Sequence, residues 1–339
     1  MSSAEADLSE LKRVIRKEYA SFFAPMERKF YSKEVEFVDP LSAFKGVDKY
    51  QGNIDFLAGR TPLGRLLFRD ASIAMHDMAD LPDGRIQTRW TLQLSVRALP
   101  WQPRARFTGV SIYTVDRAKG VVLKQEDFWD SINLKSGKYA TVGLGPAVGD
   151  FLSQLRREDG AEMSAPELPY TLLRRSPLYE VRRYPATLNI QTPYAQRPEG
   201  YDRLGSYAGG SNGEGEGKEG KEGKERVVRR KTMSWPVAFA MPGQSLSDKA
   251  TLPEPTIGKV SFTESAERVV AVTKFSLAAT EPIARGYTKQ LLSLLRNDGL
   301  TASAAAVAGD VTIGQFDALF SLNKRRVEVW VELDDHPWK

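Results

Sequence analysis

The sequence of 339 residues contains no cysteine and only two histidines, His76 and His336. The absence of cysteine excludes disulfides, thiolate zinc sites, covalently attached c-type haem and cysteine nucleophiles. From Pro169 to Val331 there is no histidine either, so this half of the chain has few options for nucleophilic or metal chemistry. We therefore expect it to hold a flat apolar ligand rather than to catalyse a reaction.

Long apolar runs and concentrated charge are also lacking. No apolar stretch approaches the roughly 20 residues that cross a bilayer, and residues 1–13 have none of the apolar character of a signal peptide. The 48 basic and 43 acidic residues give a net charge of +5 that is spread along the chain, whereas nucleic-acid binders usually concentrate it in a stripe or tail. We expect a soluble globular protein with no nucleic-acid partner and no transmembrane segment.

The first part of the chain predicts helices followed by a sheet. Apolar residues from Leu8 to Phe22 recur at three- and four-residue spacing, which indicates an amphipathic helix, and residues 47–59 predict a second helix that ends at a glycine. Strand-like runs follow, most of them alternating between apolar and polar residues; they cover residues 68–78, 84–98, 105–115 and 121–132. This order predicts an α+β cone over residues 1–134, in which a curved antiparallel sheet wraps around helices.

Residues 135–168 have the composition of a connector. They are rich in glycine, small residues and proline, with one short helix predicted at DFLSQLRRE. A second domain is then predicted over residues 169–339. Within it, residues 209–225 are almost entirely glycine, glutamate and lysine, and this composition predicts a disordered loop because little apolar surface can be buried.

The second domain shows a pattern of strands, helix and strands that occurs twice. The predicted strands cover residues 179–184, 188–191, 233–241, 260–263, 269–275, 316–322 and 327–333. We expect residues 260–263 to pair with residues 269–275. One helix is predicted around residues 201–207, and a longer one begins after Thr280. Two related halves of this kind favour a small α+β barrel.

Five segments in this domain occur in an order that resembles the SOUL haem-binding family: YEVRRYPA, GYDRLGSYAGGSN, TMSWPVAFAMP, LPEPTIGKV and RRVEVW. They extend over roughly Pro169 to Leu333. The resemblance implies a distorted β-barrel of two βαββ-like halves with two helices, which agrees with the pattern of predicted elements. The last segment departs from the family's usual RRNEVW, because Val327 replaces the asparagine.

The N-terminal half resembles a plant and algal domain of unknown function that is often fused to SOUL domains and is similar to NTF2-like cones. The segments that carry this resemblance are FYSKEVEFVDP, FKGVDKYQGNIDFL, LPWQPRARFTGVSIY and EDFWDSI. Relatives with this fusion are often plastid proteins. The resemblance therefore implies a chloroplast location, with the cytoplasm as the alternative.

The SOUL resemblance implies non-covalent binding of haem or another tetrapyrrole in an apolar groove beside the first helix of the domain. In this sequence that helix supplies the cofactor-binding candidates Arg203, Leu204, Ser206 and Tyr207. Tyr287 and Leu291, with Leu294, are further candidates for lining the groove, although the same stripe is first of all the packing face of its helix. Arginines can hold propionates through bidentate hydrogen bonds, and the candidates are Arg182, Arg183, Arg203, Arg325 and Arg326.

Iron ligation is a separate question from porphyrin binding. Some SOUL relatives are thought to use a histidine as axial ligand, but this domain has none outside its C-terminal tail. Met233, Met241 and Tyr207 are weaker candidates, since methionine and tyrosine can also ligate haem iron. We expect no metal site of the protein's own, and binding of the tetrapyrrole through its faces without a histidine ligand.

The N-terminal cone is a competing site. Cones of the NTF2-like type often enclose an apolar cavity with a carboxylate or histidine at its floor, and some are isomerases or dehydratases. Asp39, His76 and Asp127 could act there as acid or base, with Trp90 and Trp101 as walls. No constellation fixes a reaction, so we do not predict an enzyme and expect no catalytic residue. A third reading is a scaffolding protein whose two halves both bind partners. Separately, the open sheet face of the cone predicts a possible homodimer.

Overall fold

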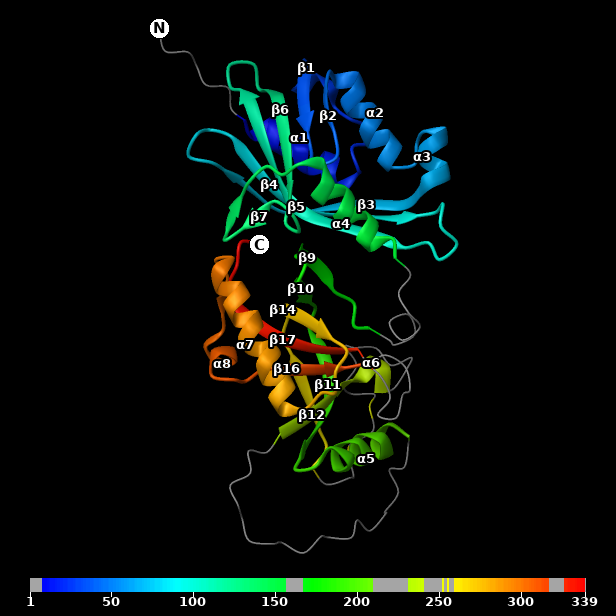
Figure 1. The fold of residues 1–339 in the computed structure, drawn as a ribbon, viewed down its shortest axis with the longest axis vertical. Helices are drawn as coiled ribbons and strands as arrows, with labels where there is room; N and C mark the ends of the chain where they lie inside the picture. Colours follow the sequence, from blue (N-terminus) through cyan, green and yellow to red (C-terminus); the bar gives the residue numbers. More distant parts are fainter. Residues whose placement is uncertain are drawn as a thin grey trace, which may run out of the picture. The chain divides into compact units, whose positions relative to one another are not determined.

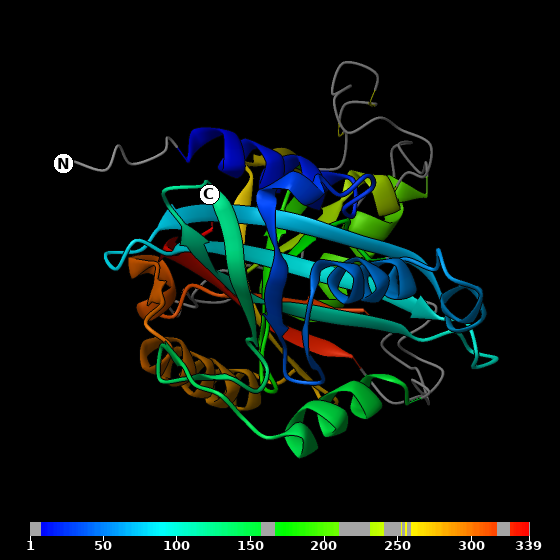
Figure 2. The same ribbon diagram turned by 90° about the horizontal axis from the view of Figure 1, so that it is seen from above.

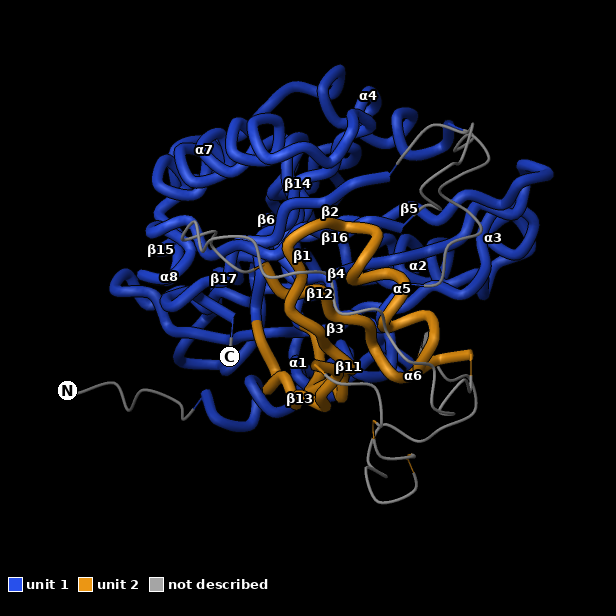
Figure 3. Tube along the Cα trace, turned by 90° about the horizontal axis from the view of Figure 1, so that it is seen from below, with its two compact units in different colours: residues 1–183, 269–339 blue, residues 184–268 orange. Residues whose placement is uncertain are grey.

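The computed structural model describes residues 8–156, 167–209, 231–240, 252, 255, 259–316 and 326–338. The predicted disordered loop, apart from Gly209, lies outside these residues, as do Met241, Arg325 and most of the strand predicted over 316–322. The chain divides into two compact units, residues 1–183 with 269–339 and residues 184–268 (Figure 3). The mixture of helices and strands in both units confirms the predicted α+β class.

The first unit begins with helices and a six-stranded sheet, the predicted cone (Figure 1). Its helices are α1 (Ser9–Ala20), η1 (Arg28–Phe30), α2 (Val47–Leu57) and α3 (Pro62–Leu67). Its strands are β1 (Tyr31–Val38), β2 (Ala43–Lys45), β3 (Phe68–Asp80), β4 (Ile86–Val96), β5 (Arg104–Asp116) and β6 (Val121–Trp129). Their order in the sheet is β2-β1-β6-β5-β4-β3, with β1 parallel to β6 and the other pairs antiparallel.

The spacing of apolar residues explains the helix α1 of the cone. The apolar stripe of α1 buries Leu11, Val14, Ile15 and Tyr19, and Figure 2 shows this helix lying along β3. We call the sheet face that packs against α1 and α2 the inner face and the opposite one the outer face. The short α3 was not predicted. It is stabilised locally, because the Thr61 side chain accepts a hydrogen bond from the Gly64 N–H and Pro62 occupies the first turn.

The connector holds a helix that belongs to the cone. After the small hairpin of β7 (Leu134–Lys135) and β8 (Lys138–Tyr139), α4 covers Leu144–Gln154, so it begins six residues before the predicted short helix. Its Phe151 ring stacks on Phe107 of β5, with centroids 6.1 Å apart. The connector is therefore structured up to this helix.

The rest of the first unit is a second sheet with two helices. Its strands are β9 (Thr171–Arg175), β10 (Glu180–Tyr184), β14 (Arg268–Phe275), β15 (Thr301–Ala302), β16 (Thr312–Gln315) and β17 (Val327–Asp335). The strand order is β15-β17-β14-β10-β9, and β16 also pairs with β17. The helices are α7 (Glu281–Asn297), which contributes Leu291 and Leu295 to the core, and α8 (Ala304–Val307).

The second unit contains β11 (Thr187–Tyr194), α5 (Arg197–Ala208), β12 (Lys231–Pro236), α6 (Val237–Ala240) and β13 (Ser261–Ser265), with strand order β12-β11-β13. Pro236 ends an edge strand, as expected for a residue without an N–H. The predicted pairing of residues 260–263 with 269–275 is wrong: β13 pairs with β11, and β14 pairs with β17. The buried β11 accepts a strand on each side, so closeness in sequence was a poor guide. None of the described helices is long and apolar enough to cross a membrane.

Candidate functional site

The helix α5 carries four of the cofactor-binding candidates, and they face two ways. Leu204 and Tyr207 are fully buried in the core of the second unit, where the Tyr207 ring lies edge-on to Phe262 at 5.9 Å. Ser206 is exposed, and Arg203 is partly exposed. The helix therefore offers its polar side to a ligand at Arg203 and Ser206, while Leu204 and Tyr207 hold it on the sheet.

Arg203 has partners within the second unit. Its guanidinium donates a 2.8 Å hydrogen bond to the carbonyl oxygen of Pro193 and pairs with Glu199 one turn earlier on α5. With 20% of its side chain exposed, it can still be reached by an anionic group at the surface. These two contacts hold the Arg203 guanidinium in one position.

The first half of α5 packs against β12 and forms a surface that is partly exposed. We call it the α5–β12 face, and it consists of Gly200, Tyr201, Met233 and Trp235. The rings of Tyr201 and Trp235 have centroids 5.9 Å apart. A Cβ on Gly200 would lie 3.0 Å from Met233 Cε, so helix and strand approach closely there. Sequence reasoning did not select Tyr201 or Trp235, although both stand in segments that carry the SOUL resemblance.

The candidates on α7 belong to the first unit. Leu291 is fully buried in the core, so its packing explains its position in the apolar stripe. Tyr287 is partly exposed and its ring stacks on Phe275, with centroids 4.3 Å apart and planes 7° from parallel. Of the two, only Tyr287 presents an aromatic surface that a ligand could reach.

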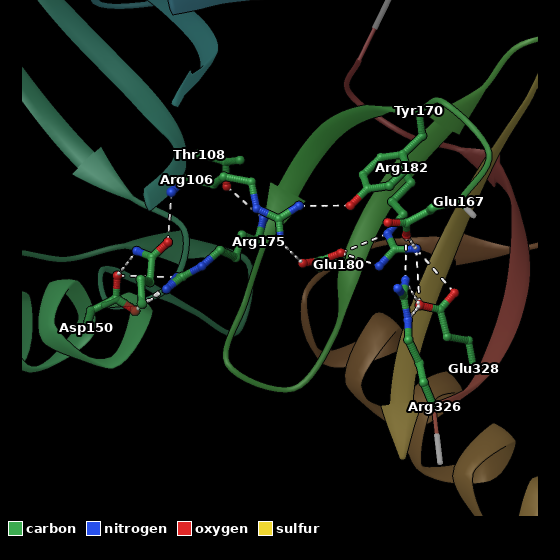
Figure 4. Close-up of polar contacts among 11 residues, drawn as sticks. Arg106, Thr108, Asp150, Glu167, Tyr170, Arg175, Glu180, Arg182, Arg326 and Glu328 are labelled. Carbon is green, nitrogen blue, oxygen red and sulfur yellow. Dashed lines mark hydrogen bonds and ion pairs between the residues drawn. The ribbon is translucent and has the colours of Figure 1, made fainter. Parts of the chain in front are cut away.

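Arg182 is engaged inside the first unit. Its side chain is fully buried and lies 2.6 Å from a carboxylate oxygen of Glu180, 3.2 Å from Glu328 and 3.4 Å from Glu167 (Figure 4). Arg326 joins the same cluster, 2.8 Å from Glu328. Contact of Arg182 or Arg326 with a propionate would require these ion pairs to break.

Buried side chains of the cone form a hydrogen-bonded cluster on its inner face. The Tyr19 hydroxyl lies within 3.1 Å of the hydroxyl oxygens of Thr88, Ser111 and Tyr113, and the indole N–H of Trp90 donates to Ser111 at 2.8 Å. Trp90 thus lies in the interior as expected. These buried polar groups satisfy one another, which is how a core with polar members is stabilised.

Asp127 is the most perturbed carboxyl of the cone. Burial raises its pKa to about 7, and the nearby Asp39 adds to this rise, while hydrogen bonds from Ser111 and Gln125 oppose it. Asp39 itself accepts hydrogen bonds from the backbone N–H groups of Leu41 and Ser42, at 2.7 and 2.5 Å. Asp39 is therefore a turn residue, which its place before Pro40 also favours.

His76 and Trp101 lie outside the cone interior. The His76 ring contacts the Thr91 hydroxyl at 2.8 Å on the outer face, where burial and the charge of Arg183 lower its pKa to about 4. Trp101 is 40% exposed and donates to the carbonyl oxygen of Leu155 at 2.9 Å. The structure does not bring these two residues together with Asp127, because His76 lies beside Thr91 on the outer face and Trp101 lies at the surface.

An open groove of about 580 Å³ follows the edge of the cone's sheet. It is lined by Arg16, Tyr19 and Ala20 of α1 and by all residues from 73 to 78 of β3. Successive residues of a strand point to opposite faces, so a groove lined by six in a row runs along the strand's edge. Asp127 is not among its lining residues.

Family models match both halves of the chain. Residues 165–332 match the model of the SOUL heme-binding protein family, and residues 9–123 match the model described as "Uncharacterized conserved protein (DUF2358)". The resemblances expected from the sequence are thereby confirmed. No curated protein matches the chain.

Solved structures with similarity to the chain are of low identity. An NTF2-like protein of unknown function from Exiguobacterium sp. 255-15 shares 15% identity over 34% of this chain and 96% of its own, with a TM-score of 0.27. A putative polyketide cyclase from Pseudomonas putida KT2440 shares 11% over 36% and 90%, with a TM-score of 0.28. A protein with a ketosteroid isomerase-like fold from Catenulispora acidiphila DSM 44928 shares 7% over 42% and 90%, with a TM-score of 0.29. Such low values carry no functional argument.

Proposed function

We propose, from the match of residues 165–332 to the SOUL heme-binding family, that this chain binds haem or another tetrapyrrole non-covalently. In this proposal the protein carries or buffers the ligand and catalyses no reaction. The family match is the observation on which the proposal depends, and the geometry of the second unit supports it.

The α5–β12 face has the chemistry that a porphyrin requires. Tyr201, Trp235 and Met233 provide flat and polarisable apolar surface, and Arg203 at the exposed side of α5 can pair with a propionate. A ligand of about 40 heavy atoms, at about 0.3 kcal/mol each, can reach about 12 kcal/mol, which corresponds to nanomolar affinity. Apolar contact and one or two charge pairs are therefore sufficient without iron ligation.

The positions of the histidines support binding without a histidine ligand. His76 is hydrogen bonded on the outer face of the cone, and the His336 ring lies 5.9 Å from the buried Trp338 in the tail. Neither belongs to the second unit. A bound haem would supply its own iron chemistry, and the residues named here would hold the ring and its carboxylates.

Titration of the full chain with haemin tests this proposal. We expect a saturable Soret change with one site per chain, and iron-free protoporphyrin IX should bind with similar affinity because the iron is not ligated. No saturable change at micromolar haemin would contradict binding altogether. A loss of affinity of more than about tenfold for the iron-free ring would instead show that iron is ligated.

Matched variants locate the site. Arg203→Ala should weaken binding about tenfold, or about 1.4 kcal/mol, whereas Arg285→Ala, which removes the same kind of one-turn pair with Glu281 on α7, should not. Tyr201→Ala against Tyr287→Ala decides between α5 and α7. An effect confined to Tyr287→Ala would move the site to α7.

The alternative of a reaction inside the cone is supported by one observation, the pKa of about 7 at Asp127, which suits general acid–base chemistry. Against it, the tyrosine, tryptophan and serine side chains around Tyr19 occupy the inner face and bond to one another. We therefore propose a structural role for the cone. Asp127→Asn should leave haemin affinity unchanged.

We also propose a chloroplast location, on the resemblance of the two-part chain to plastid proteins, with the cytoplasm as the alternative. Fractionation of cells that contain the protein distinguishes the two. A homodimer through the cone remains a prediction. It would have to use the part of the outer sheet face that β9 leaves uncovered, since Thr91 and Thr108 on that face bond to β9.

A further inference from the structure

The strand β9 is buried on both faces although it is the end strand of its sheet. Leu172 and Leu173 are 6% and 1% exposed. Leu173 belongs to the core formed with α7, so a different part of the first unit covers the Leu172 side.

That cover is the outer face of the cone. The Thr91 hydroxyl on β4 donates a 2.5 Å hydrogen bond to the carbonyl oxygen of Leu172. The backbone N–H of Arg175 donates a 2.7 Å hydrogen bond to the Thr108 hydroxyl on β5. Both threonines are buried, so two side-chain hydroxyls of the cone satisfy the backbone of an end strand.

Charged groups support the same contact between the cone and the β9–β10 pair. Arg106 of β5 donates to the Tyr170 hydroxyl at 2.8 Å and pairs with Glu180 of β10 at 3.0 Å (Figure 4). Burial alone would raise the pKa of Glu180, but the guanidinium groups of Arg106 and Arg182 lower it to about 2. Arg175, which lies opposite Glu180 in the β9–β10 ladder, pairs with Asp150 of α4 at 2.9 Å.

We propose that the outer face of the cone is a docking surface for an edge β-strand, and that its occupant is β9 of this chain. The cone thus caps the edge of the SOUL-type sheet, and the two parts of the first unit unfold as one cooperative body. An uncapped edge is a template for pairing with other chains. The hydroxyl contacts of Thr91 and Thr108 involve only backbone atoms of β9, so they do not depend on its sequence. The ion pair between Arg106 and Glu180 does depend on sequence and therefore favours the β9–β10 pair of this chain. This role is independent of tetrapyrrole binding.

Removing the hydroxyls from the full chain tests the capping. In the double variant Thr91→Val with Thr108→Val, we expect amide hydrogen exchange in β9 and β10 to be at least about tenfold faster, which corresponds to about 1.4 kcal/mol, with concentration-dependent self-association by light scattering. Thr91→Ser with Thr108→Ser keeps the hydroxyls and should behave as the parent. Thr114→Val is the matched control on the outer face of β5, where no hydroxyl contact to β9 exists.

A substitution far from β9 tests the cooperativity. Val35 on β1 is fully buried in the cone core, and Val35→Ala should accelerate the slowest-exchanging amides of β5 and of β17 by the same factor. Faster exchange in β5 with unchanged exchange in β17 would overturn the single cooperative body. Parent-like exchange in β9 for the double valine variant would overturn the capping, and the single valine variants serve if the double variant does not fold.

Discussion

The guanidinium of Arg182 and the carboxylate of Glu328 lie 3.2 Å apart with both side chains fully buried. Arg182 stands on β10 in the segment YEVRRYPA, and Glu328 stands on β17 in the segment RRVEVW. Two segments that carry the SOUL resemblance therefore meet in a structural ion pair. Their arginines cannot be assigned to a ligand from the sequence pattern alone.

Loss of the Glu328 charge should be costly. Its carboxylate accepts hydrogen bonds from Arg182, Arg326 and the indole N–H of Trp330. Glu328→Gln keeps the shape but leaves two buried guanidinium groups short of an anion, so we expect the free energy of unfolding to fall by about 3–5 kcal/mol. Urea denaturation measures this change.

The exposed pair between Glu281 and Arg285 gives the control. Its side chains are 56% and 65% exposed, and exposed pairs contribute little, so Glu281→Gln should change the free energy of unfolding by less than about 1 kcal/mol. Equal effects of the two substitutions would show that the buried cluster has no special weight.

The hydroxyl of Tyr19 should stabilise the cone through its neighbours. Tyr19→Phe removes the group that Thr88, Ser111 and Tyr113 share, and we expect a loss of about 1–3 kcal/mol in unfolding free energy because buried hydroxyls lose a partner. Tyr287→Phe is the matched control on α7. If the two phenylalanine variants unfold at the same urea concentration, the hydroxyl cluster is not stabilising.

Local pattern predicted the elements of the cone well. The spacing of apolar residues in α1 and the alternation in β4, β5 and β6 reflect burial on one face, which a sequence records directly. The helix α3 was not predicted, because a helix of six residues is too short to show a periodic pattern and only the N-cap at Thr61 indicates it. The pairing of β13 with β11 was not predicted, because strand pairing depends on which strand edges remain free in the folded chain.

The candidate site was harder to predict for the same reason. The sequence around Arg182 predicts an exposed charged residue on an edge strand. In the structure Arg182 is buried, because it pairs with Glu328, which lies 146 positions later in the chain. His76 contacts Thr91 on the outer face, and the sequence does not show which face of β3 packs against the helices of the cone. Tyr201 and Trp235 were present in the recognised segments, but only the packing of α5 against β12 brings their rings together.

The stability of the cone should depend on pH through Asp127. A folded-state pKa of about 7 against an ordinary value of 3.8 means that the folded form binds the proton more tightly than the unfolded form. Stability from this group is therefore full below about pH 4 and falls as the pH rises to about 7. Asp127→Asn can still accept the hydrogen bond from Gln125, so it should unfold with a weaker pH dependence in this range.

Urea denaturation at pH 5 and pH 8 measures the difference. The parent should lose more stability between these values than Asp127→Asn does. Burial raises the pKa values of Glu18 and Asp39 in both proteins, so the difference between parent and variant reports Asp127 together with its interaction with Asp39. A parent and a variant with the same pH dependence would mean that Asp127 is ionised at low pH like an exposed aspartate.

Gly109 should be irreplaceable in the sheet of the cone. A Cβ at this position of β5 would lie 2.0 Å from the carbonyl oxygen of Phe128 on β6, and this contact is with backbone, which cannot turn aside. Gly109→Ala must push the two strands apart, and we expect it to cost at least about 1–3 kcal/mol in unfolding free energy.

In α4 the opposite holds for Gly149, whose Cβ would meet nothing within 4 Å. Gly149→Ala should leave stability unchanged or raise it by up to about 1 kcal/mol, so thermal unfolding of the two alanine variants should move in opposite directions. A shift in the same direction would contradict the close approach of β5 and β6.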